Sequence, residues 1–421
     1  MPVTLDQLAA TLHQFFQDKL PGQVGDTAGS ALLVFDPFGM PLAAEDFGVG
    51  GTDSQQQLLA HQRAGHLADQ LPAANGLSNG WYLAQTGSRL SRWYHTLVSE
   101  SSCTSTSDQD KTAFEARKAA ALQELDLNAM IEVAGATSTG TTVDPTGVHD
   151  SFYATGMTPT SWYRPDADCW ETHHIDGTEA PPSSDPSPLP MPGFHLRVDS
   201  PPPSPASPES DSLPDGFFMP QLADDNSQFI VATWGKHVGD PVTAGEPIVD
   251  VESGKVTAEL QSPATGTLLE ITAQEGDAVP VGALLALIGA GQPSPSPATD
   301  GFDVTFDYCL VTFDRPWWDE VFIATPTWSV PGFTAGQIAS GDARAPALAI
   351  PAITTGMIVI RNLQIAATWT DSDQQRLTSG AVSLGPFSVT GATFNGQTLN
   401  RQGMQATAWI CQVPPVLPPT Q

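Results

Sequence analysis

A seven-residue motif, G-D-x-V-x-x-G, occurs twice in the chain and constrains the fold more than any other feature. "GDPVTAG" begins at Gly239 and "GDAVPVG" begins at Gly276, an offset of 37 residues. Each copy lies between two strand-like apolar runs, "FIVATW" and "PIVDV" in the first half and "TLLEIT" and "LLALI" in the second. Each Gly-Asp pair supplies turn chemistry that an apolar strand does not tolerate. Two similar four-stranded halves that close into one small flattened barrel are therefore expected at residues 215–290.

Proline- and serine-rich segments lie on both sides of this block. One reads "DSPPPSPASPESDSLP" and the other reads "GQPSPSPATD". Such sequences give extended tethers with no core to bury. The fold class that follows is α+β and multidomain, with an all-β barrel between the tethers. The chain is divided into a mixed α/β region at 1–180, a Pro/Ser-rich segment at 181–214 with one strand at 193–198, the barrel at 215–290, a linker at 291–300 and a β-rich domain at 301–421.

Strand-like runs beside the tethers indicate that the barrel is an insertion. "GFHLRV", residues 193–198, precedes the first tether, and "FDVTFDYCLVTF", residues 302–313, follows the second. Insertions are tolerated best at exposed loop tips. Residues 301–421 are therefore predicted to form one composite domain with residues 1–198. Two tethers also restrict reach, because both ends must close on the same hairpin.

Hydrophobic periodicity predicts the main elements of the flanks. Apolar residues recur at helical spacing in "TLDQLAATLHQFFQDKL", residues 4–20, and in "DQDKTAFEARKAAALQEL", residues 108–125. "SALLVFD", residues 30–36, is predicted to be a strand, and Asn395-Gly396 is a strong hairpin signal. The run at 302–313 has five apolar residues that alternate with other residues and are expected on one buried face: Phe302, Val304, Phe306, Tyr308 and Leu310.

The charge balance excludes several classes of partner. The chain has 16 Lys and Arg against 46 Asp and Glu, a net charge of −30. Nucleic acids and anionic membranes bind through clustered basic residues, so neither is expected as a partner. No apolar run reaches the roughly 18 residues of a membrane span, and the first twenty residues do not resemble a secretory signal. The four scattered cysteines predict no disulfide framework, which fits reduced thiols in the cytoplasm.

A lysine stands where the barrel sequence predicts a hairpin tip. The chain has only five lysines, and Lys255 follows Ser253-Gly254 between two strand-like runs in "VDVESGKVTAELQSPATG". Gly254 tolerates the positive φ that a two-residue hairpin turn requires. Glu252 makes the surroundings acidic. A long side chain on a protruding rigid turn is the arrangement that a swinging arm needs.

Several linked motifs resemble the biotinyl/lipoyl attachment domain, and most closely the lipoyl domain of 2-oxo acid dehydrogenase acyltransferase components. They are "MPQL" at 219–222, "VGDPV" at 238–242, "ESGKVTAEL" at 252–260, "SPATG" at 262–266 and "EGDAVPVG" at 275–282. Gly239 lies 16 residues before the lysine and Gly266 lies 11 after it, which is similar to the family spacing. The resemblance covers about 75 residues, and neither flank resembles a known family.

The resemblance implies that Lys255 is joined by an amide to lipoate or biotin. Biotin sites in this family have methionine on both sides of the lysine, whereas Gly254 and Val256 flank it here, so lipoate is favoured over biotin. The implied hairpin context is Glu252, Ser253, Gly254 and Val256. Lipoyl domains usually have aspartate before the lysine, and Gly254 departs from that pattern at a position that bears on recognition by a decarboxylase partner.

Other readings of the same residues stay open. Lys255 could be a solvated turn residue, as in the unmodified hybrid-motif domains of other proteins. The acyltransferase motif H-x-x-x-D-G is approached by "HHIDG" at 173–177, which is one residue short and is predicted to be a turn with chance similarity. Cys169, His173 and His174 are predicted to lie in a surface loop, and "SESSCTSTS", residues 99–107, in a polar loop. No catalytic residue and no metal site are predicted.

The sequence therefore predicts a carrier protein rather than an enzyme. Its partners would be a lipoate ligase or transferase and an unidentified acyl or redox enzyme, and a homo-oligomer or particle stays open. The alternative is a structural or assembly protein that displays an unmodified lipoyl-like domain. A dihydrolipoyl acyltransferase is a distant third.

Overall fold

The structure is a computed structural model, and it describes most of the chain outside the tethers. Described are residues 5–20, 25, 27–47, 54–78, 80–131, 151–176, 196–198, 215–220, 229–237, 239–253, 256–271, 273, 275, 278–279, 284–289, 292–293, 302–343, 345, 349–379 and 381–419. Gly254 and Lys255 lie outside the described residues, as do nearly all residues of the two predicted tethers.

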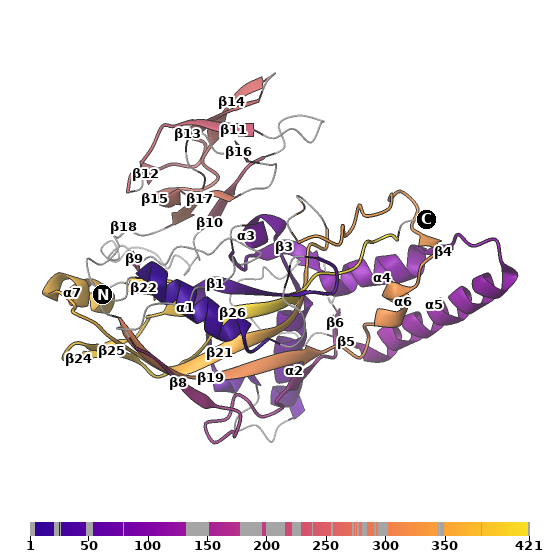
Figure 1. The fold of residues 1–421 in the computed structure, drawn as a ribbon, viewed down its shortest axis with the longest axis horizontal. Coiled ribbons are helices and arrows are strands. Elements are labelled where there is room, and N and C mark those ends of the chain that lie inside the picture. The colour runs from indigo at the N-terminus through magenta and orange to yellow at the C-terminus, as the bar shows by residue number, and fades with distance from the viewer. Residues whose placement is uncertain are drawn as a thin grey trace.

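Strands from both ends of the chain form one antiparallel sheet of eight strands. Its main path runs β1 (Ala31–Leu42), β26 (Met404–Gln412), β21 (Ile353–Ala366), β19 (Asp303–Asp314) and β7 (Gly156–Thr158). Beside this path, β8 (Glu171–Ile175) pairs with β19, β25 (Thr398–Arg401) pairs with β21, and β24 (Thr393–Asn395) pairs with β25. The N-terminal and C-terminal flanks therefore share a sheet (Figure 1).

Both faces of this sheet are covered, so its strands bury residues on both sides. In β19, Val304, Phe306 and Tyr308 enter one apolar cluster, while Cys309 and Val311 enter the cluster on the other face. The expectation of a single buried face holds only for the first half of the strand, and Leu310 is half-buried. A strand whose two faces are both packed against other elements shows alternating burial only where the packing on one face is incomplete.

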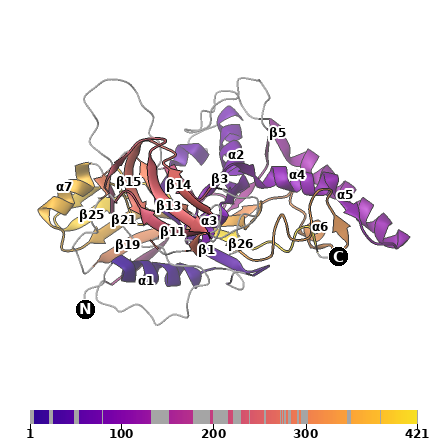
Figure 2. The same cartoon turned by 90° about the horizontal axis from the view of Figure 1, so that it is seen from above.

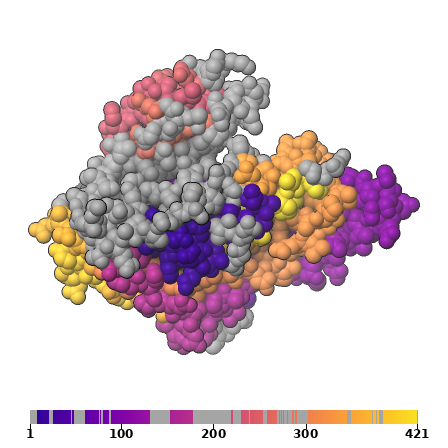
Figure 3. All heavy atoms as spheres, viewed as in Figure 1, coloured from indigo at the N-terminus to yellow at the C-terminus, as the bar shows by residue number. Residues whose placement is uncertain are grey.

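Helices cover the sheet on either side. Helix α1 (Leu5–Gln17) packs on the first face through Leu8, Leu12 and Phe16, which confirms the helix predicted there. It lies on the molecular surface toward the viewer in Figure 3. Helix α7 (Asp371–Ser379) contributes Leu377 to the same face. On the other face lie α2 (Ser54–Asp69), the short 3-10 helix η1 (Ala44–Phe47) and α3 (Ala74–Ser78).

A helical arm extends from one end of the sheet. It consists of α4 (Leu90–Glu100), α5 (Asp108–Asn128) and α6 (Glu320–Ala324), and Figures 1 and 2 show α5 pointing away from the body. Phe114 and Leu125 anchor α5, as predicted, and fully buried Trp317 lies in the same cluster. Cys103 is in β4 (Ser102–Cys103), which pairs with β20 (Trp328–Ser329). The polar loop predicted for residues 99–107 is therefore wrong at this strand.

Smaller sheets complete the flanks. Two hairpin-like pairs are β2 (Gln70–Pro72) with β3 (Ala84–Arg89), and β5 (Ala129–Ile131) with β6 (Ser151–Tyr153). A four-stranded sheet runs β18 (Gln292–Pro293), β9 (Leu196–Val198), β22 (Ala381–Leu384) and β23 (Phe387–Ser388). The strand predicted at 193–198 is confirmed for its described part. The linker predicted at 291–300 is wrong at residues 292–293, which form β18 and pair with β9.

The repeat-bearing block forms two four-stranded sheets around its own core. One sheet runs β10 (Asp215–Phe218), β17 (Leu284–Gly289), β15 (Gly266–Ile271) and β12 (Pro241–Val242). The other runs β14 (Val256–Gln261), β13 (Pro247–Ser253), β11 (Phe229–Trp234) and β16 (Ala278–Val279). Equivalent strands of the two halves begin 37 positions apart. This holds for three pairs: β11 with β15, β12 with β16, and β13 with β17.

The two halves of the block exchange their short strands. β12 follows β11 in the chain but pairs with β15, and β16 follows β15 but pairs with β11. The pairs Val242↔Gly266 and Val279↔Phe229 are equivalent under the 37-residue offset. The predicted barrel of two similar halves is thus present, with the halves interlocked.

Among the described residues, no helix has the length and apolar character required to cross a membrane.

Candidate functional site

The hairpin of β13 and β14 defines the position of the candidate lysine. The strands pair in antiparallel register from Pro247↔Gln261 to Ser253↔Val256. Gly254 and Lys255 are the two residues between the last pair, and they lie outside the described residues. The register on either side is that of a two-residue hairpin connection, the kind that favours glycine.

One face of this hairpin is built into the barrel core, and the other is acidic. Val249, Val251 and Leu260 are buried in the cluster between the two sheets. On the opposite face, Asp250 stands directly across from Glu259. Like charges in this arrangement destabilise a strand pair, so the apolar face must supply the stability of the hairpin.

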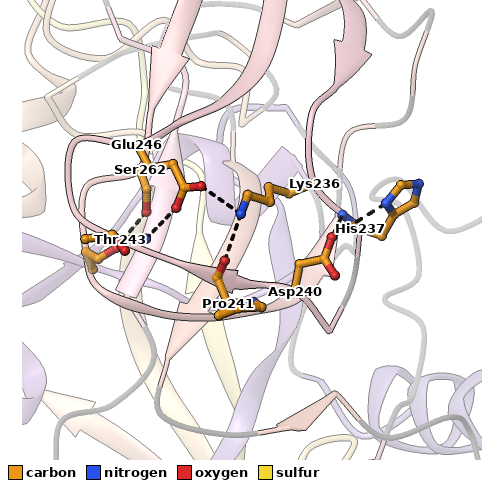
Figure 4. A network of polar contacts seen from close by, with 8 residues as sticks. Lys236, His237, Asp240, Pro241, Thr243, Glu246 and Ser262 are labelled. Carbon is orange, nitrogen blue, oxygen red and sulfur yellow. Dashed lines mark hydrogen bonds and ion pairs between the residues drawn. The ribbon is translucent and has the colours of Figure 1, made fainter.

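A network of charged contacts closes the base of the hairpin, at the opposite end from Ser253↔Val256 (Figure 4). Lys236 Nζ lies 2.7 Å from Glu246 Oε1 and donates a 3.0 Å hydrogen bond to the Pro241 carbonyl. The Thr243 amide donates to Glu246 Oε2 at 2.9 Å. The hydrogen bond from Lys236 is the main cause that holds the pKa of Glu246 below its usual range. The amine of Lys236 is therefore already engaged in the fold.

Backbone hydrogen bonds tie the two strands at the same base. The Gly245 amide donates to the Ser262 carbonyl at 2.9 Å, and the Ser262 amide donates to the Glu246 carbonyl at 2.8 Å. The Ser262 hydroxyl donates to the Ala264 carbonyl at 2.7 Å. Each end of the hairpin is thus fixed by a different means: β-pairing toward Ser253 and Val256, and a polar clamp at the base.

The first Gly-Asp motif makes the turn that the sequence predicts. Gly239 has φ of 108°, a left-handed conformation that other residues adopt with strain. The Asp240 carboxylate accepts a 2.9 Å hydrogen bond from the His237 amide, which is the main cause of the lowered pKa of Asp240. The Gly239 amide donates to the Leu268 carbonyl, and the Leu268 amide donates to the Asp240 carbonyl. The motif therefore joins the first half of the barrel to the second.

Gly266 is required by close backbone packing. A Cβ atom there would lie 2.7 Å from the Gly289 carbonyl oxygen, which belongs to the neighbouring strand. No side chain fits at that distance without a shift of the backbone. This gives a physical reason for the glycine in the "SPATG" motif.

The "HHIDG" segment is not the turn that was predicted. His173 to Ile175 belong to β8 and pair with β19 from Phe306 to Val304. The His173 ring stacks on Phe15 at 3.5 Å between ring centroids, and burial is the first cause of its lowered pKa. The nearby surface-loop prediction is wrong for His174 as well, whose Nδ1 lies 2.9 Å from Thr305 Oγ1.

Metal-ligating groups do not gather anywhere in the described part of the chain. No three or more His, Cys, Asp or Glu side chains there are placed to hold a metal ion. Cys169 lies close to His173 and His174 in the sequence, but the two histidine side chains contact different elements. His173 stacks on Phe15 of α1, and His174 forms a hydrogen bond with Thr305 of β19. The cluster that the sequence brings together is thus dispersed by pairing.

The sequence analysis did not predict the ion pair between Lys236 and Glu246, called the Lys236–Glu246 clamp below. The two residues are ten positions apart and on either side of the first Gly-Asp turn, so they meet only when β12 and β13 are placed. The available signal was the scarcity of lysine, because Lys236 is the only lysine besides Lys255 in residues 215–290. The structure thereby shows that Lys236 is engaged in the fold.

Comparison with known proteins places this block in a family. Residues 216–288 match the model described as "Biotin-requiring enzyme". The dihydrolipoyllysine-residue succinyltransferase component of the 2-oxoglutarate dehydrogenase complex of Bartonella vinsonii subsp. berkhoffii is 43% identical over 76 residues, 18% of this chain and 18% of that protein. The dihydrolipoyllysine-residue acetyltransferase component of the pyruvate dehydrogenase complex of Corynebacterium glutamicum is 36% identical over 97 residues, 23% of this chain and 14% of that protein.

A solved structure shows the same relation in sequence. The lipoyl domain of the 2-oxoglutarate dehydrogenase complex from Azotobacter vinelandii is 37% identical, and the match covers 18% of this chain and 96% of that one with a TM-score of 0.17. At that score the superposition adds nothing to the sequence identities. The chain spans less than a fifth of the two curated relatives, so the relation concerns the barrel alone. Residues 216–288 of this chain belong to the biotinyl/lipoyl attachment family, with lipoyl domains of 2-oxo acid dehydrogenase acyltransferases as their relatives.

Proposed function

We propose that the barrel is a carrier domain with lipoate joined by an amide to Lys255, presented to a separate enzyme that acts on an acyl or redox group. The observation that carries this proposal is the register of β13 and β14, which ends at Ser253↔Val256 and leaves Lys255 in the two-residue connection. The relatives of the barrel are named for a dihydrolipoyllysine residue. Lipoate is preferred over biotin because Gly254 and Val256, rather than methionines, flank the lysine.

The engaged state of Lys236 supports the choice of lysine. An amine that forms a 2.7 Å ion pair and a hydrogen bond to a carbonyl would have to break both before it could attack an activated acyl group. Attachment at Lys255 rather than at Lys236 follows.

The anchoring of the barrel supports short-range delivery. β17 ends at Gly289 and β18 begins at Gln292, so two residues separate the barrel from a strand that pairs with β9. On the other side, 16 residues separate Val198 from Asp215, a length that spans at most about 58 Å when extended. We infer that the barrel is inserted into a composite domain of both flanks and is held close to the strand pair β18 and β9. An enzyme partner would then have to dock close to this protein.

Intact-mass analysis of three proteins from a host that lipoylates its own domains tests the attachment. The wild type and Lys236→Arg are expected to carry a lipoyl amide, and Lys255→Arg is expected to lack it. Lys236→Arg is the matched control, because it keeps a cation at the other lysine of the barrel. A lipoyl mass that persists in Lys255→Arg would refute the site. A biotin mass on Lys255 would keep the carrier class and refute the cofactor.

Display of an unmodified domain is the second candidate function. Gly254 in place of the usual aspartate and the two-residue connection between β17 and β18 both favour it over long-range transfer. An unmodified Lys255 in protein isolated from the native organism would support display and refute the carrier. An acyltransferase is not favoured, because residues 173–175 of the segment that approaches its motif lie in β8, with His173 stacked on Phe15.

A further inference from the structure

The main sheet is interrupted where β21 changes its partner strand. Up to Ile360 it pairs with β26, and from Leu363 onward it pairs with β25. Arg361 and Asn362 lie between these two ladders, and the register of β21 with β19 also shifts there. Asn362 has φ of 53°, a left-handed conformation, and its amide reaches the Gln402 carbonyl only at 3.4 Å. Bulges and left-handed residues of this kind are frequent beside binding sites, because they redirect side chains.

A cleft of about 470 Å³ lies at this interruption. Its volume is within the range of about 300–1,000 Å³ that small-molecule sites occupy. Four segments line it: residues 42–44, residues 163 and 165, residues 361–362, and residues 402–404. The first two segments come from the N-terminal flank and the last two from the C-terminal flank. The cleft therefore exists only when both flanks fold together.

The one charged residue in the lining, Arg361, is held in place and its charge is balanced. Its Nε lies 3.5 Å from Asp307 Oδ2, and its Nη1 donates to the Pro165 carbonyl at 3.0 Å. Its guanidinium carbon lies over the Trp170 ring, 4.1 Å from the ring centroid. Asn362 Nδ2 donates to the same Asp307 oxygen at 2.8 Å. The wall of the cleft is thus preorganised and, as a pair of opposite charges, electrically neutral.

Other polar groups of the lining remain available to a ligand. Within the described part of the chain, no hydrogen bond occupies the Tyr163 hydroxyl or the Gln402 carboxamide. Tyr163 is half-buried and Gln402 is exposed. A hydroxyl and a carboxamide can each donate and accept. Leu42 and Met404 add apolar surface beside them.

We propose that this cleft binds an uncharged polyhydroxylated ligand, a sugar of one or two rings. The hydroxyl groups of a sugar both donate and accept, which matches the groups that Tyr163 and Gln402 offer. The C–H faces of a sugar ring are apolar and fit surface of the kind that Leu42 and Met404 provide. This site is independent of Lys255 and of any lipoyl group.

Charged ligands fit the same wall less well. Burial acts to raise the pKa of Asp307, but hydrogen bonds from Thr172 and Asn362 and the charge of Arg361 outweigh it and hold the pKa below its usual range. Asp307 is therefore ionised at neutral pH. An anion at Arg361 would meet that carboxylate and a chain with a net charge of −30. A cation would meet the fixed guanidinium.

Saturation-transfer difference NMR of the full chain with neutral sugars tests the site. The panel is glucose, galactose, mannose and N-acetylglucosamine, with the disaccharides maltose, cellobiose and lactose. At least one sugar is expected to bind, and its titration gives Kd. Gln402→Ala and Tyr163→Phe each remove one hydrogen-bonding group and are expected to weaken Kd by about 2–10-fold. Gln375→Ala removes an exposed glutamine of α7 that does not line the cleft, and this matched control should keep the wild-type Kd.

Three results would overturn the proposal. The first is that no sugar of the panel binds. The second is a Kd that both Gln402→Ala and Tyr163→Phe leave unchanged, because the sugar would then lie elsewhere. The third is tighter binding of glucuronate or glucosamine than of every neutral sugar, because these carry an anionic and a cationic group. Circular dichroism checks that each variant is folded, and Gln402→Ala decides alone if Tyr163→Phe is not, because the Gln402 side chain is exposed.

Discussion

Acidification is expected to destabilise the flanking domain through one buried histidine. His13 lies on α1 and is 7% exposed, with its ring 6.0 Å from the ring of Phe35. Burial lowers its pKa from 6.5 to about 4, and a hydrogen bond with the Leu33 backbone opposes that shift only in part. Protonation of His13 would place a charge between α1 and the sheet.

The magnitude follows from the difference between the folded and unfolded proton affinities. In the unfolded chain His13 binds a proton below about pH 6.5, but in the folded protein only below about pH 4. The unfolded state therefore binds more protons in this window, and the free energy of unfolding falls as the pH drops. Between pH 7.5 and pH 5 this linkage is worth about 2 kcal/mol, and it approaches about 3 kcal/mol below pH 4.

Urea denaturation at pH 7.5, 6 and 5 measures this contribution. The quantity of interest is the change in unfolding free energy with pH, compared between wild type and His13→Leu. The variant is expected to lose about 2 kcal/mol less than wild type over this range. Equal pH dependence in His13→Leu and wild type would refute the assignment of a buried neutral imidazole.

Three further outcomes are expected. Gly266→Ala should destabilise the barrel by about 1–3 kcal/mol in thermal unfolding of an isolated 215–290 fragment, because its Cβ meets the Gly289 carbonyl at 2.7 Å; an unchanged Tm would contradict this. Asp69→Ala should cost about 2–4 kcal/mol in urea, because the buried carboxylate accepts from the Ser91 amide at 2.7 Å and hydroxyl at 2.6 Å; a loss below about 0.5 kcal/mol would count against it. Replacing residues 199–300 by an Asn-Gly turn should leave a folded outer domain by circular dichroism, and flanks that express as separate, non-associating domains would rule out the insertion.

Local sequence signals predicted the elements whose partners are close or whose pattern is strong. Leu8, Leu12 and Phe16 mark α1 because one apolar stripe faces a single surface. Asn395-Gly396 marks the turn of β24 and β25, where Gly396 has φ of 61°. The barrel was predictable because its repeat, its turns and its family motifs all indicate the same arrangement. These levels of information agree, which is what specifies a fold.

Elements that depend on distant partners were not predictable. β8 has the sequence E-T-H-H-I, with no apolar alternation, and becomes a strand because β19 supplies its backbone partners about 130 residues away. β4 has two residues and exists because Trp328 and Ser329 pair with it. The Lys236–Glu246 clamp likewise requires a turn between its members. In each case the deciding contact is tertiary, and the local chain is neutral toward it.

Exchange of the short strands has a consequence for the ancestry of the barrel. The half at residues 229–261 contains a short strand, β12, that pairs only with β15 of the other half. Its own strand β11 pairs with β16, which the other half supplies. The same relation holds in reverse for the half that begins 37 positions later. Two identical halves would satisfy one another about a two-fold axis, which is the isologous geometry of a symmetric dimer. Duplication and fusion of such a gene would convert a dimer that dissociates on dilution into one chain in which the partner is always present at high effective concentration. In the fused barrel only β13 continues into a hairpin with β14, next to Lys255, whereas the equivalent strand β17 pairs with β10 from the other end of the block.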